Sequence, residues 1–214
     1  MKKENNKRIT SFSKKKKEEI IEIKIILLGD PGVGKTNIIN RYLFNNFEQS
    51  SKPTLGSAFG EKTIKKDGVS YLLKIWDTTG QERYNSITKL FIRGSNIVLL
   101  VYSIDNLESF DSLKNWFNYV KEELQRDKYI LAIVGNKKDL FENEVISEDE
   151  GKEFAKKLNA FFYLVSAKCD ANGIENSFNS LLDELILKFG KKTLNETSIR
   201  LEEDDINNRG KKCC

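Results

Sequence analysis

The stretch from residue 23 to residue 36, IKIILLGDPGVGKT, constrains this chain more than any other. An apolar run rich in isoleucine stops at Gly29, and a loop with three glycines then ends on Lys35 and Thr36. This is the pattern G-x-x-x-x-G-K-[ST], set after an expected strand and before an expected helix. Glycines let backbone N–H groups turn toward an anion, and the helix adds the positive end of its dipole. The stretch predicts a phosphate-binding loop; the alternative is a glycine-rich turn in an ordinary α/β protein.

In loops of this pattern the lysine holds the β- and γ-phosphates of a nucleotide, and the hydroxyl after it ligates Mg²⁺. We assign these tasks to Lys35 and Thr36. The residues expected to bind the nucleotide here are Asp30, Pro31, Gly32, Val33, Gly34, Lys35, Thr36 and Asn37. The loop alone does not select the base.

The length of 214 residues suits one domain with appendages, and 39% hydrophobic residues can fill a substantial core. No apolar run is long enough to span a bilayer. The N-terminal sequence MKKENNKRITSFSKKKK has no continuous hydrophobic segment, so secretion is not expected. With few cysteines, the chain needs no disulfide framework.

The positive charge is concentrated in an N-terminal arm. Residues 1–17 carry eight Lys/Arg and one acid, net +7, whereas residues 18–188 carry 22 against 26, net −4. Basic arms of this kind are most often solvated tails; less often they bind anionic lipid or nucleic acid. Because no nucleic-acid motif is present, a solvated tail is favoured and nucleic acid is not an expected partner. We divide the chain into a flexible arm (1–19), a domain (20–189) and a disordered tail (190–214).

Strand-like and helix-like stretches alternate as far as Phe189. This alternation predicts an α/β fold with a mostly parallel sheet, helices on both faces, and a ligand at the carboxyl ends of the strands. After the run before Gly29, the expected strands span residues 59–66, 69–77, 96–103, 129–135 and 160–165. The expected helices span residues 36–44, 107–124, 147–158 and 173–188. The polar stretch 45–60 is expected to be a long loop, and loops of that length are usually functional.

Polar clusters follow three of these strands. One begins at Asp77, and an acid there, followed by glycine, is where phosphate-loop proteins place a second Mg²⁺ contact. Asn136-Lys137-Lys138-Asp139 follows the strand 129–135, and Ser166-Ala167-Lys168 follows the last strand. Because the carboxyl ends of parallel strands meet at one edge of a sheet, we expect these clusters to share one site.

In this order the motifs GDPGVGKT, Thr54, DTTGQ, NKKD and SAK resemble those of the small GTPases of the Ras superfamily, over about residues 20–189. Within that superfamily the chain is similar to the Rab proteins. IWDTTGQERY is close to the Rab sequence IWDTAGQERF, PTLGSAF is similar to STIGVDF, and the last two residues are Cys213 and Cys214. The resemblance implies a P-loop GTP-binding domain with six strands and five helices, with GTP or GDP and Mg²⁺ as ligands.

Guanine is the expected base. Asp139 can accept the N1–H and N2 amino hydrogens of guanine, whereas adenine would present a lone pair to that carboxylate. The resemblance implies that Asn136 binds N7, that Lys137 packs along the base and that the Ala167 N–H meets O6. The base-binding residues that it implies are Phe47, Asn136, Lys137, Asp139, Ser166, Ala167 and Lys168.

Phe47 stands seven residues before Thr54, the family's spacing for an aromatic ring packed over the guanine. Each of these signals has a plain alternative when taken alone. NKKD could be a solvated turn, and Phe47 could be a loop anchor. Their joint occurrence after two buried strands favours GTP over ATP.

The implied reaction is hydrolysis of GTP to GDP and phosphate, which requires positioning and charge stabilisation more than covalent chemistry. The resemblance implies that the Gly80 N–H meets the γ-phosphate and that Gln81 orients the attacking water. The implied catalytic residues are Lys35, Thr54, Gly80 and Gln81. The implied metal-binding residues are Thr36, Thr54 and, through water, Asp77. When the γ-phosphate leaves, Thr54 and Gly80 lose their contacts, which makes the protein a switch.

Two residues depart from the family pattern beside the expected γ-phosphate. Pro31 has no N–H and adds a ring where an activating protein's arginine must approach. Thr79 replaces the alanine of DTAGQ. Together they predict slow intrinsic hydrolysis. They also keep open an alternative, a membrane-anchored binding module that stays mostly GTP-bound with little useful hydrolysis.

The tail is polar and poor in core-forming residues, so a linker without regular structure is expected from 190 to 212. The resemblance implies geranylgeranyl groups on Cys213 and Cys214, since stable anchoring takes two chains; the alternative is two idle thiols. Cys169 is expected to be an ordinary loop residue. The implied partners are an exchange factor, a GTPase-activating protein, effectors, a prenylation escort and a GDP-dissociation inhibitor. The implied protein is a monomer that cycles between the cytosol and the cytoplasmic face of an intracellular membrane.

Overall fold

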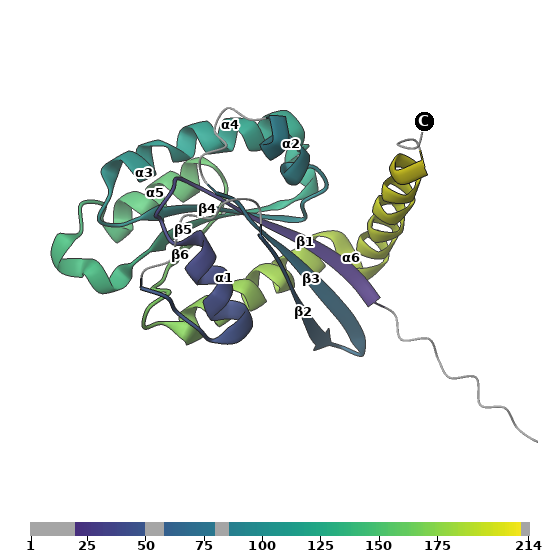
Figure 1. Cartoon of the computed structure of the whole chain (residues 1–214), viewed down its shortest axis with the longest axis horizontal. Helices are drawn as coiled ribbons and strands as arrows, with labels where there is room; N and C mark the ends of the chain where they lie inside the picture. The colour runs from purple at the N-terminus through teal and green to yellow at the C-terminus, as the bar shows by residue number, and fades with distance from the viewer. Residues whose placement is uncertain (1–19, 50–57, 80–85, 211–214) are drawn as a thin grey trace, which may run out of the picture.

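The computed structural model describes residues 20–49, 58–79 and 86–210. Its centre is a six-stranded sheet in the order β2-β3-β1-β4-β5-β6 (Figure 1). The strands are β1 (Ile20–Leu28), β2 (Ala58–Lys66), β3 (Val69–Asp77), β4 (Ile97–Ser103), β5 (Ile130–Asn136) and β6 (Phe161–Leu164). All neighbouring strands are parallel except β2 and β3, which form an antiparallel hairpin. The α/β fold with a mostly parallel sheet is therefore confirmed.

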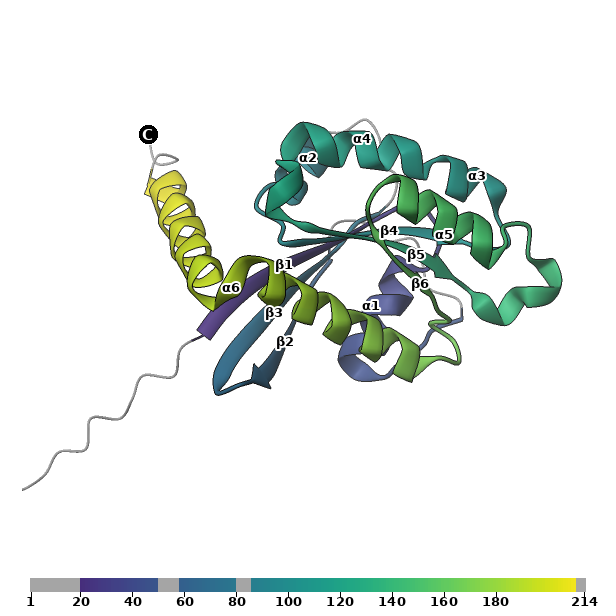
Figure 2. The same ribbon diagram turned by 180° about the vertical axis from the view of Figure 1, so that it is seen from behind.

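Six α-helices in the described residues cover the two faces of the sheet (Figures 1 and 2). They are α1 (Lys35–Phe44), α2 (Ser86–Ile92), α3 (Leu107–Asp111), α4 (Leu113–Glu123), α5 (Glu148–Lys157) and α6 (Ala171–Gly210). The expected number was five. The helix expected over 107–124 divides at Ser112, whose hydroxyl donates to the Glu108 carbonyl at 2.8 Å. Such side-chain bonds to the preceding turn compete with regular helix geometry.

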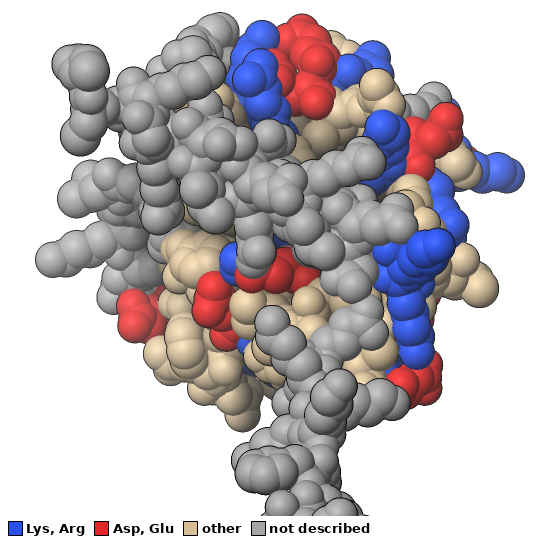
Figure 3. Space-filling model, turned by 90° about the vertical axis from the view of Figure 1, so that its right-hand side faces the viewer, with Lys and Arg blue, Asp and Glu red and all other residues tan. Residues whose placement is uncertain are grey.

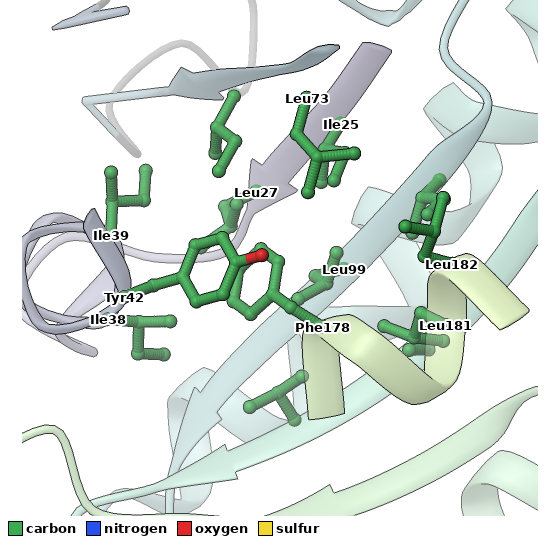
Figure 4. Close-up of a cluster of buried hydrophobic side chains, with 14 of the residues drawn as sticks. Ile25, Leu27, Ile38, Ile39, Tyr42, Leu73, Leu99, Phe178, Leu181 and Leu182 are labelled. Carbon is green, nitrogen blue, oxygen red and sulfur yellow. The ribbon is translucent and has the colours of Figure 1, made fainter. Parts of the chain in front are cut away.

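Each face of the sheet carries its own buried hydrophobic cluster. Ile23 of β1 packs toward α1 and α6, whereas Ile26 packs toward α2, α4 and α5. Strands β4 and β5 are buried at every residue, as central parallel strands should be. In the first cluster the rings of Tyr42 and Phe178 stack with centroids 4.0 Å apart (Figure 4). Burial raises the pKa of the Tyr42 hydroxyl, so the ring stays neutral in this core.

Ion pairs on the surface tie the β2–β3 hairpin to α6. Lys62 lies 3.5 Å from Glu175, and Lys66 pairs with Asp183. On the face seen in Figure 3, Lys and Arg side chains gather along one edge, with acidic side chains beside them. Exposed pairs contribute at most about 1 kcal/mol each, so these contacts align the hairpin more than they hold the fold.

The tail departs from the linker expected for it. Helix α6 continues to Gly210, with a break at Gly190, where φ is +71°. After the break Leu194 is only 4% exposed and packs into the same cluster as α1. Lys191 lies 3.5 Å from Asp67 at the hairpin turn. One apolar side chain thus finds a place on the core, and packing continues beyond the boundary drawn from composition.

Some expectations lie outside the described residues: those for the arm (1–19), for the segments 50–57 and 80–85, and for the last four residues. They stay predictions, as does the division of the chain into arm, domain and tail. In the described ranges, no helix has the length and apolarity that crossing a membrane requires.

Candidate functional site

A cavity of about 510 Å³ lies where β1, β3, β5 and β6 end. This volume is in the range of small-ligand sites. The residues that line it are Pro31, Gly32, Gly34, Lys35, Thr36, Asn37, Phe47, Gln49, Thr78, Thr79, Asn136, Lys137, Asp139, Leu140, Ala167 and Lys168. Residues from all three polar clusters that were expected to share one site therefore line one cavity, although Asp77, Lys138 and Ser166 themselves do not.

The loop between β1 and α1 follows a path that only glycine permits at two positions. Gly29 has φ +147°, and a Cβ there would lie 2.2 Å from the Val101 carbonyl oxygen. Gly34 has φ +94°, and a Cβ there would lie 2.3 Å from Nδ2 of Asn136. Residues other than glycine rarely adopt such φ values. The backbone itself thus forms the wall at this end, a cradle that fits phosphate groups.

Lys35 is the first residue of α1 and is 4% exposed. Its Nζ donates to the carbonyls of Gly29 at 2.7 Å and Asp30 at 3.0 Å, so the ammonium is held beside the loop. The Asp30 carboxylate accepts from Nε1 of Trp116 in α4 at 2.8 Å, with both side chains buried. Asp30 and Val33, which were expected to bind the nucleotide, are not among the residues that line the cavity.

Thr36 and Asp77 meet at the floor of this end. The Thr36 hydroxyl donates to Oδ2 of Asp77 at 2.6 Å, and Asp77 is 2% exposed. A hydroxyl and a carboxylate suit Mg²⁺, which prefers oxygen ligands and keeps several waters while it binds substrate phosphates. In the described part of the chain, no group of three or more Cys, Asp or Glu could hold a metal alone. The donor set fits a metal whose other ligands come from water and a bound nucleotide.

At the other end Asn136 braces two loops. Its Nδ2 donates to the Val33 carbonyl at 2.8 Å, and its Oδ1 accepts from the Ala167 N–H at 3.1 Å. Asn136 is 1% exposed. An amide nitrogen has two N–H groups, so one remains for a ligand. In this structure the Ala167 N–H points to Asn136, whereas the resemblance implies O6 of guanine as its acceptor.

Asp139 is oriented by the loop after β6. Its Oδ1 accepts from the Ser166 hydroxyl, and the Ser166 oxygen in turn accepts from the N–H groups of Lys168 and Cys169, each at 3.2 Å. The Lys168 ammonium lies 4.0 Å from Oδ2 of Asp139. Ser166 does not line the cavity; it positions the carboxylate that does. Nearby, Lys137 has φ +65° and also lines the wall.

Phe47 both lines the cavity and packs against the core cluster of α1. The two interpretations of this ring, a base-stacking residue and a loop anchor, are therefore compatible. Asn37 holds the segment in place, because its Nδ2 donates to the Glu48 carbonyl at 3.1 Å and its Oδ1 accepts from the Glu48 N–H at 3.2 Å.

Thr54, Gly80 and Gln81, the expected switch and catalytic residues, lie outside the described residues. Four lining residues had no predicted binding role: Gln49, Thr78, Thr79 and Leu140. Thr78 follows Asp77 directly and donates to the Leu27 carbonyl at 2.8 Å, so position after a buried strand was the available signal. Two positioning residues were also missed. Arg41 contacts the loop after β6, Trp116 binds Asp30, and no local motif marks either contact.

The family model for the Ras family matches residues 24–187, which include every described residue at this cavity. The chain belongs to the Ras family. Members bind guanine nucleotides and hydrolyse GTP, and they are regulated by exchange factors, GTPase-activating proteins and effectors. This Ras-family chain is thus a small GTPase related to the Rab proteins.

Curated relatives of this Ras-family protein carry Rab names. "Ras-related protein RabC" of Dictyostelium discoideum is 38% identical over 199 residues, 92% of this chain and 100% of the relative. "Ras-related protein Rab-11B" of the same organism is 40% identical over 87% of this chain and 81% of the relative. "Ras-related protein Rab-17" of Homo sapiens is 36% identical over 89% and 90%. The similarity therefore covers the whole Ras-family domain.

Proposed function

We propose that this protein is a Rab-type switch that binds GTP or GDP with Mg²⁺, hydrolyses GTP, and recruits effectors in membrane trafficking when GTP-bound. The observation that carries the proposal is that one cavity joins a glycine-determined loop, the Thr36–Asp77 pair and the Asp139 carboxylate. The first fits phosphates, the second a shared Mg²⁺ and the third the edge of guanine. The Rab names of the relatives support the trafficking role.

The chain's own residues divide the work between binding and hydrolysis. Lys35 would hold the β- and γ-phosphates, and the bound Mg²⁺ would neutralise charge on them. Thr36 would bind that ion directly and Asp77 through water. Gln81 would orient the attacking water, while Thr54 and Gly80 would sense the γ-phosphate.

Nucleotide binding is tested by calorimetry with GDP and ADP in the presence of Mg²⁺. We expect GDP to bind at least about 1,000-fold more tightly, because a carboxylate facing adenine would be left unpaired. Removing Mg²⁺ with EDTA should speed GDP release, since Thr36 and Asp77 would hold a metal that also binds the nucleotide. Equal affinity for the two nucleotides would overturn the proposal.

An aromatic cluster near both expected switch segments is the surface we assign to effectors. Phe59 follows the segment 50–57 and is 47% exposed, and its ring lies 5.0 Å from that of Trp76. Trp76 in turn lies 5.3 Å from Phe91, on the helix that follows the segment 80–85. A half-exposed aromatic patch of this kind is typical of a protein interface. Phe59→Ala should weaken effector capture without changing GDP affinity.

Pro31 and Thr79 favour a second candidate, a GTP-holding module with little hydrolysis. Both residues line the cavity, and Pro31 is exposed at its mouth. Single-turnover hydrolysis with Mg²⁺ tests this candidate, and so does the nucleotide found after purification. Mostly GTP supports the module and mostly GDP supports the enzyme. If the double variant Pro31→Ser, Thr79→Ala is no faster than the parent, these residues do not slow the reaction.

For the membrane, we propose prenylation of Cys213 and Cys214 with delivery by an escort protein and retrieval by a GDP-dissociation inhibitor. Two prenyl chains provide the stable attachment that one does not. Mass spectrometry of protein from its native cells is the test. Two unmodified thiols on the membrane-bound fraction would rule the anchor out.

A further inference from the structure

Arg41 lies in the last turn of α1 and reaches across to the loop after β6. Its Nε donates to the Ala167 carbonyl at 2.8 Å, and its Nη2 donates to the Lys168 carbonyl at 2.9 Å. These partners are 126 and 127 residues away in the sequence. One guanidinium thus holds two consecutive carbonyls of the loop whose residues Ala167 and Lys168 line the base end of the cavity.

The same guanidinium also holds the turn that leads to Phe47. Its Nη1 donates to the backbone carbonyl and to Oδ1 of Asn45, both at 3.0 Å. Asn45 caps α1 in the left-handed conformation, with φ +52°. Phe47 follows two residues later and lines the cavity. Arg41 therefore connects two parts of the base end, the turn that leads to Phe47 and the loop that contains Ala167 and Lys168.

These bonds need an arginine. A guanidinium presents its donors in a rigid planar fork, whereas a lysine ammonium is a single centre on a flexible stem. Charge-assisted hydrogen bonds are also stronger than neutral ones. In the ranges that the structure describes, no carboxylate lies within ion-pair distance of Arg41. The guanidinium is used to fix backbone geometry and not to neutralise an acid.

We propose that Arg41 is a positioning residue for the base: by holding the Ala167–Lys168 carbonyls and the Asn45 turn together, it sets the walls that enclose the guanine. It also positions the Ala167 N–H, which donates to Asn136 in this structure and would read O6 when the base is bound. The inference rests on the proposed guanine nucleotide binding. It assigns Arg41 no contact with the nucleotide. Its effect is on base affinity and on discrimination at O6, and not on the phosphates.

The test compares Arg41→Lys with the parent in competition binding against a fluorescent GDP. The competitors are GDP, inosine diphosphate, which lacks the 2-amino group, and 2-aminopurine riboside diphosphate, which lacks O6. We expect Arg41→Lys to release GDP about tenfold faster, as the loss of charge-assisted bonds implies. The preference for GDP over the O6-lacking analogue should shrink by a similar factor. The preference for GDP over inosine diphosphate should stay unchanged, because Asp139 recognises the 2-amino group that inosine lacks.

Arg93→Lys is the matched control, because Arg93 pairs with Glu123 on the surface at 2.7 Å and does not line the cavity. It should leave all three affinities as they are. A second variant, Asn45→Gly, keeps the left-handed turn and removes one acceptor of the fork. We expect it to speed GDP release by about threefold, less than Arg41→Lys, because one neutral acceptor is lost. It carries the test if Arg41→Lys does not fold.

The outcomes separate two kinds of failure. If the parent does not prefer GDP to ADP, the proposed function fails before the variants are compared. If the parent does, but Arg41→Lys weakens all three nucleotides equally or only lowers thermal stability, Arg41 is structural and the inference is overturned. The same holds if Asn45→Gly alone can be measured and changes nothing.

Discussion

The phosphate end and the base end of the cavity are built by different means. At the phosphate end the wall is backbone, and Gly29 and Gly34 adopt conformations that exclude a side chain. At the base end the side chains of Asn136 and Asp139 form part of the wall, and residues far away in the sequence orient them. Asn136 braces two loops, and Arg41 joins two others. One end is determined locally and the other by tertiary contacts, so the two should respond differently to substitution.

The largest effect is expected where the two ends touch. Gly34→Ala would place a Cβ 2.3 Å from Nδ2 of Asn136, and it would also strain a backbone with φ +94°. Strain of about 1–2 kcal/mol and the loss of about two hydrogen bonds near 1 kcal/mol each predict GDP binding weaker by at least about 100-fold. Calorimetry measures this.

The control for that substitution is Gly68→Ala, because Gly68 also has positive φ, +74°, but has no heavy atom within 4 Å of an added Cβ. It should cost stability while GDP affinity stays the same. A Gly34→Ala protein that binds GDP within threefold of the parent would show that the ends are not joined at this point.

The next effect is confined to the base end. Asp139→Ala should weaken GDP by about 30-fold, through the loss of charge-assisted hydrogen bonds worth about 2 kcal/mol. ADP affinity should rise, since the substitution removes the carboxylate that would face a lone pair of adenine. Asp127→Ala, an exposed carboxylate on the 3₁₀ turn Arg126–Lys128, is the control. A parallel loss for ADP would mean that Asp139 supports both ends and not the base alone.

A smaller effect should follow from loosening the phosphate end at its anchor. Trp116→Phe removes the N–H that binds the buried Asp30 carboxylate. The loss of this buried, charge-assisted hydrogen bond should cost about 1–3 kcal/mol of unfolding free energy, while GDP release rises only about threefold because the glycines still direct the loop. Denaturant unfolding and stopped-flow release measure the two.

Trp76→Phe is the matched control, since the chain has two tryptophans and Trp76 does not line the cavity. In that variant the single indole N–H resonance in a ¹H–¹⁵N spectrum belongs to Trp116. Adding Asp30→Ala should shift it strongly; an unmoved resonance would contradict the anchor.

The smallest effect lies away from both ends, at the start of α5. Bonds from the hydroxyl and the N–H of Ser147 lower the pKa of Glu150, which completes a capping box. Its stabilising effect is therefore present above the pKa of the unfolded chain and is lost as the pH falls through the lowered folded value. Glu150→Gln should be less stable than the parent at neutral pH, with the difference closing in acid. Urea unfolding at several pH values measures it, and GDP release should not change.

This contrast also explains what the sequence could predict. The phosphate loop was recognised from residues 23–36 because its glycines, lysine and threonine are neighbours in the chain. Asp77 and the clusters after β5 and β6 were expected at one edge because strand ends imply it. Residues of the clusters after β5 and β6 do line one cavity, and Asp77 is bonded to Thr36, which lines it too. Arg41 and Trp116 were missed as positioning residues because their partners lie 126 and 86 residues away, and no local pattern marks such pairs.

Two features of the helices, the division at Ser112 and the helical tail, were not predicted, and both have physical reasons. At Ser112 the division coincides with a hydroxyl bond to the preceding turn, and a hydrophobic pattern does not register such a bond. The helical tail has four apolar residues in an otherwise polar stretch, Leu194, Ile199, Leu201 and Ile206, and Leu194 is buried against the core. The average composition of this stretch predicts a linker, because an average does not show that one apolar side chain is buried against the core.

The contacts of Lys191 and Leu194 affect how the outer end of α6 can move. Residues 191–210 form about 30 Å of helix at 1.5 Å per residue, projecting from the domain in Figure 1. Its inner turn is fastened to the hairpin through Lys191 and to the core through Leu194. A flexible chain of equal length would limit only how far its outer end can travel. A helix fastened at its base acts as a lever, so a small rotation of the β2–β3 hairpin would become a sideways displacement at the outer end.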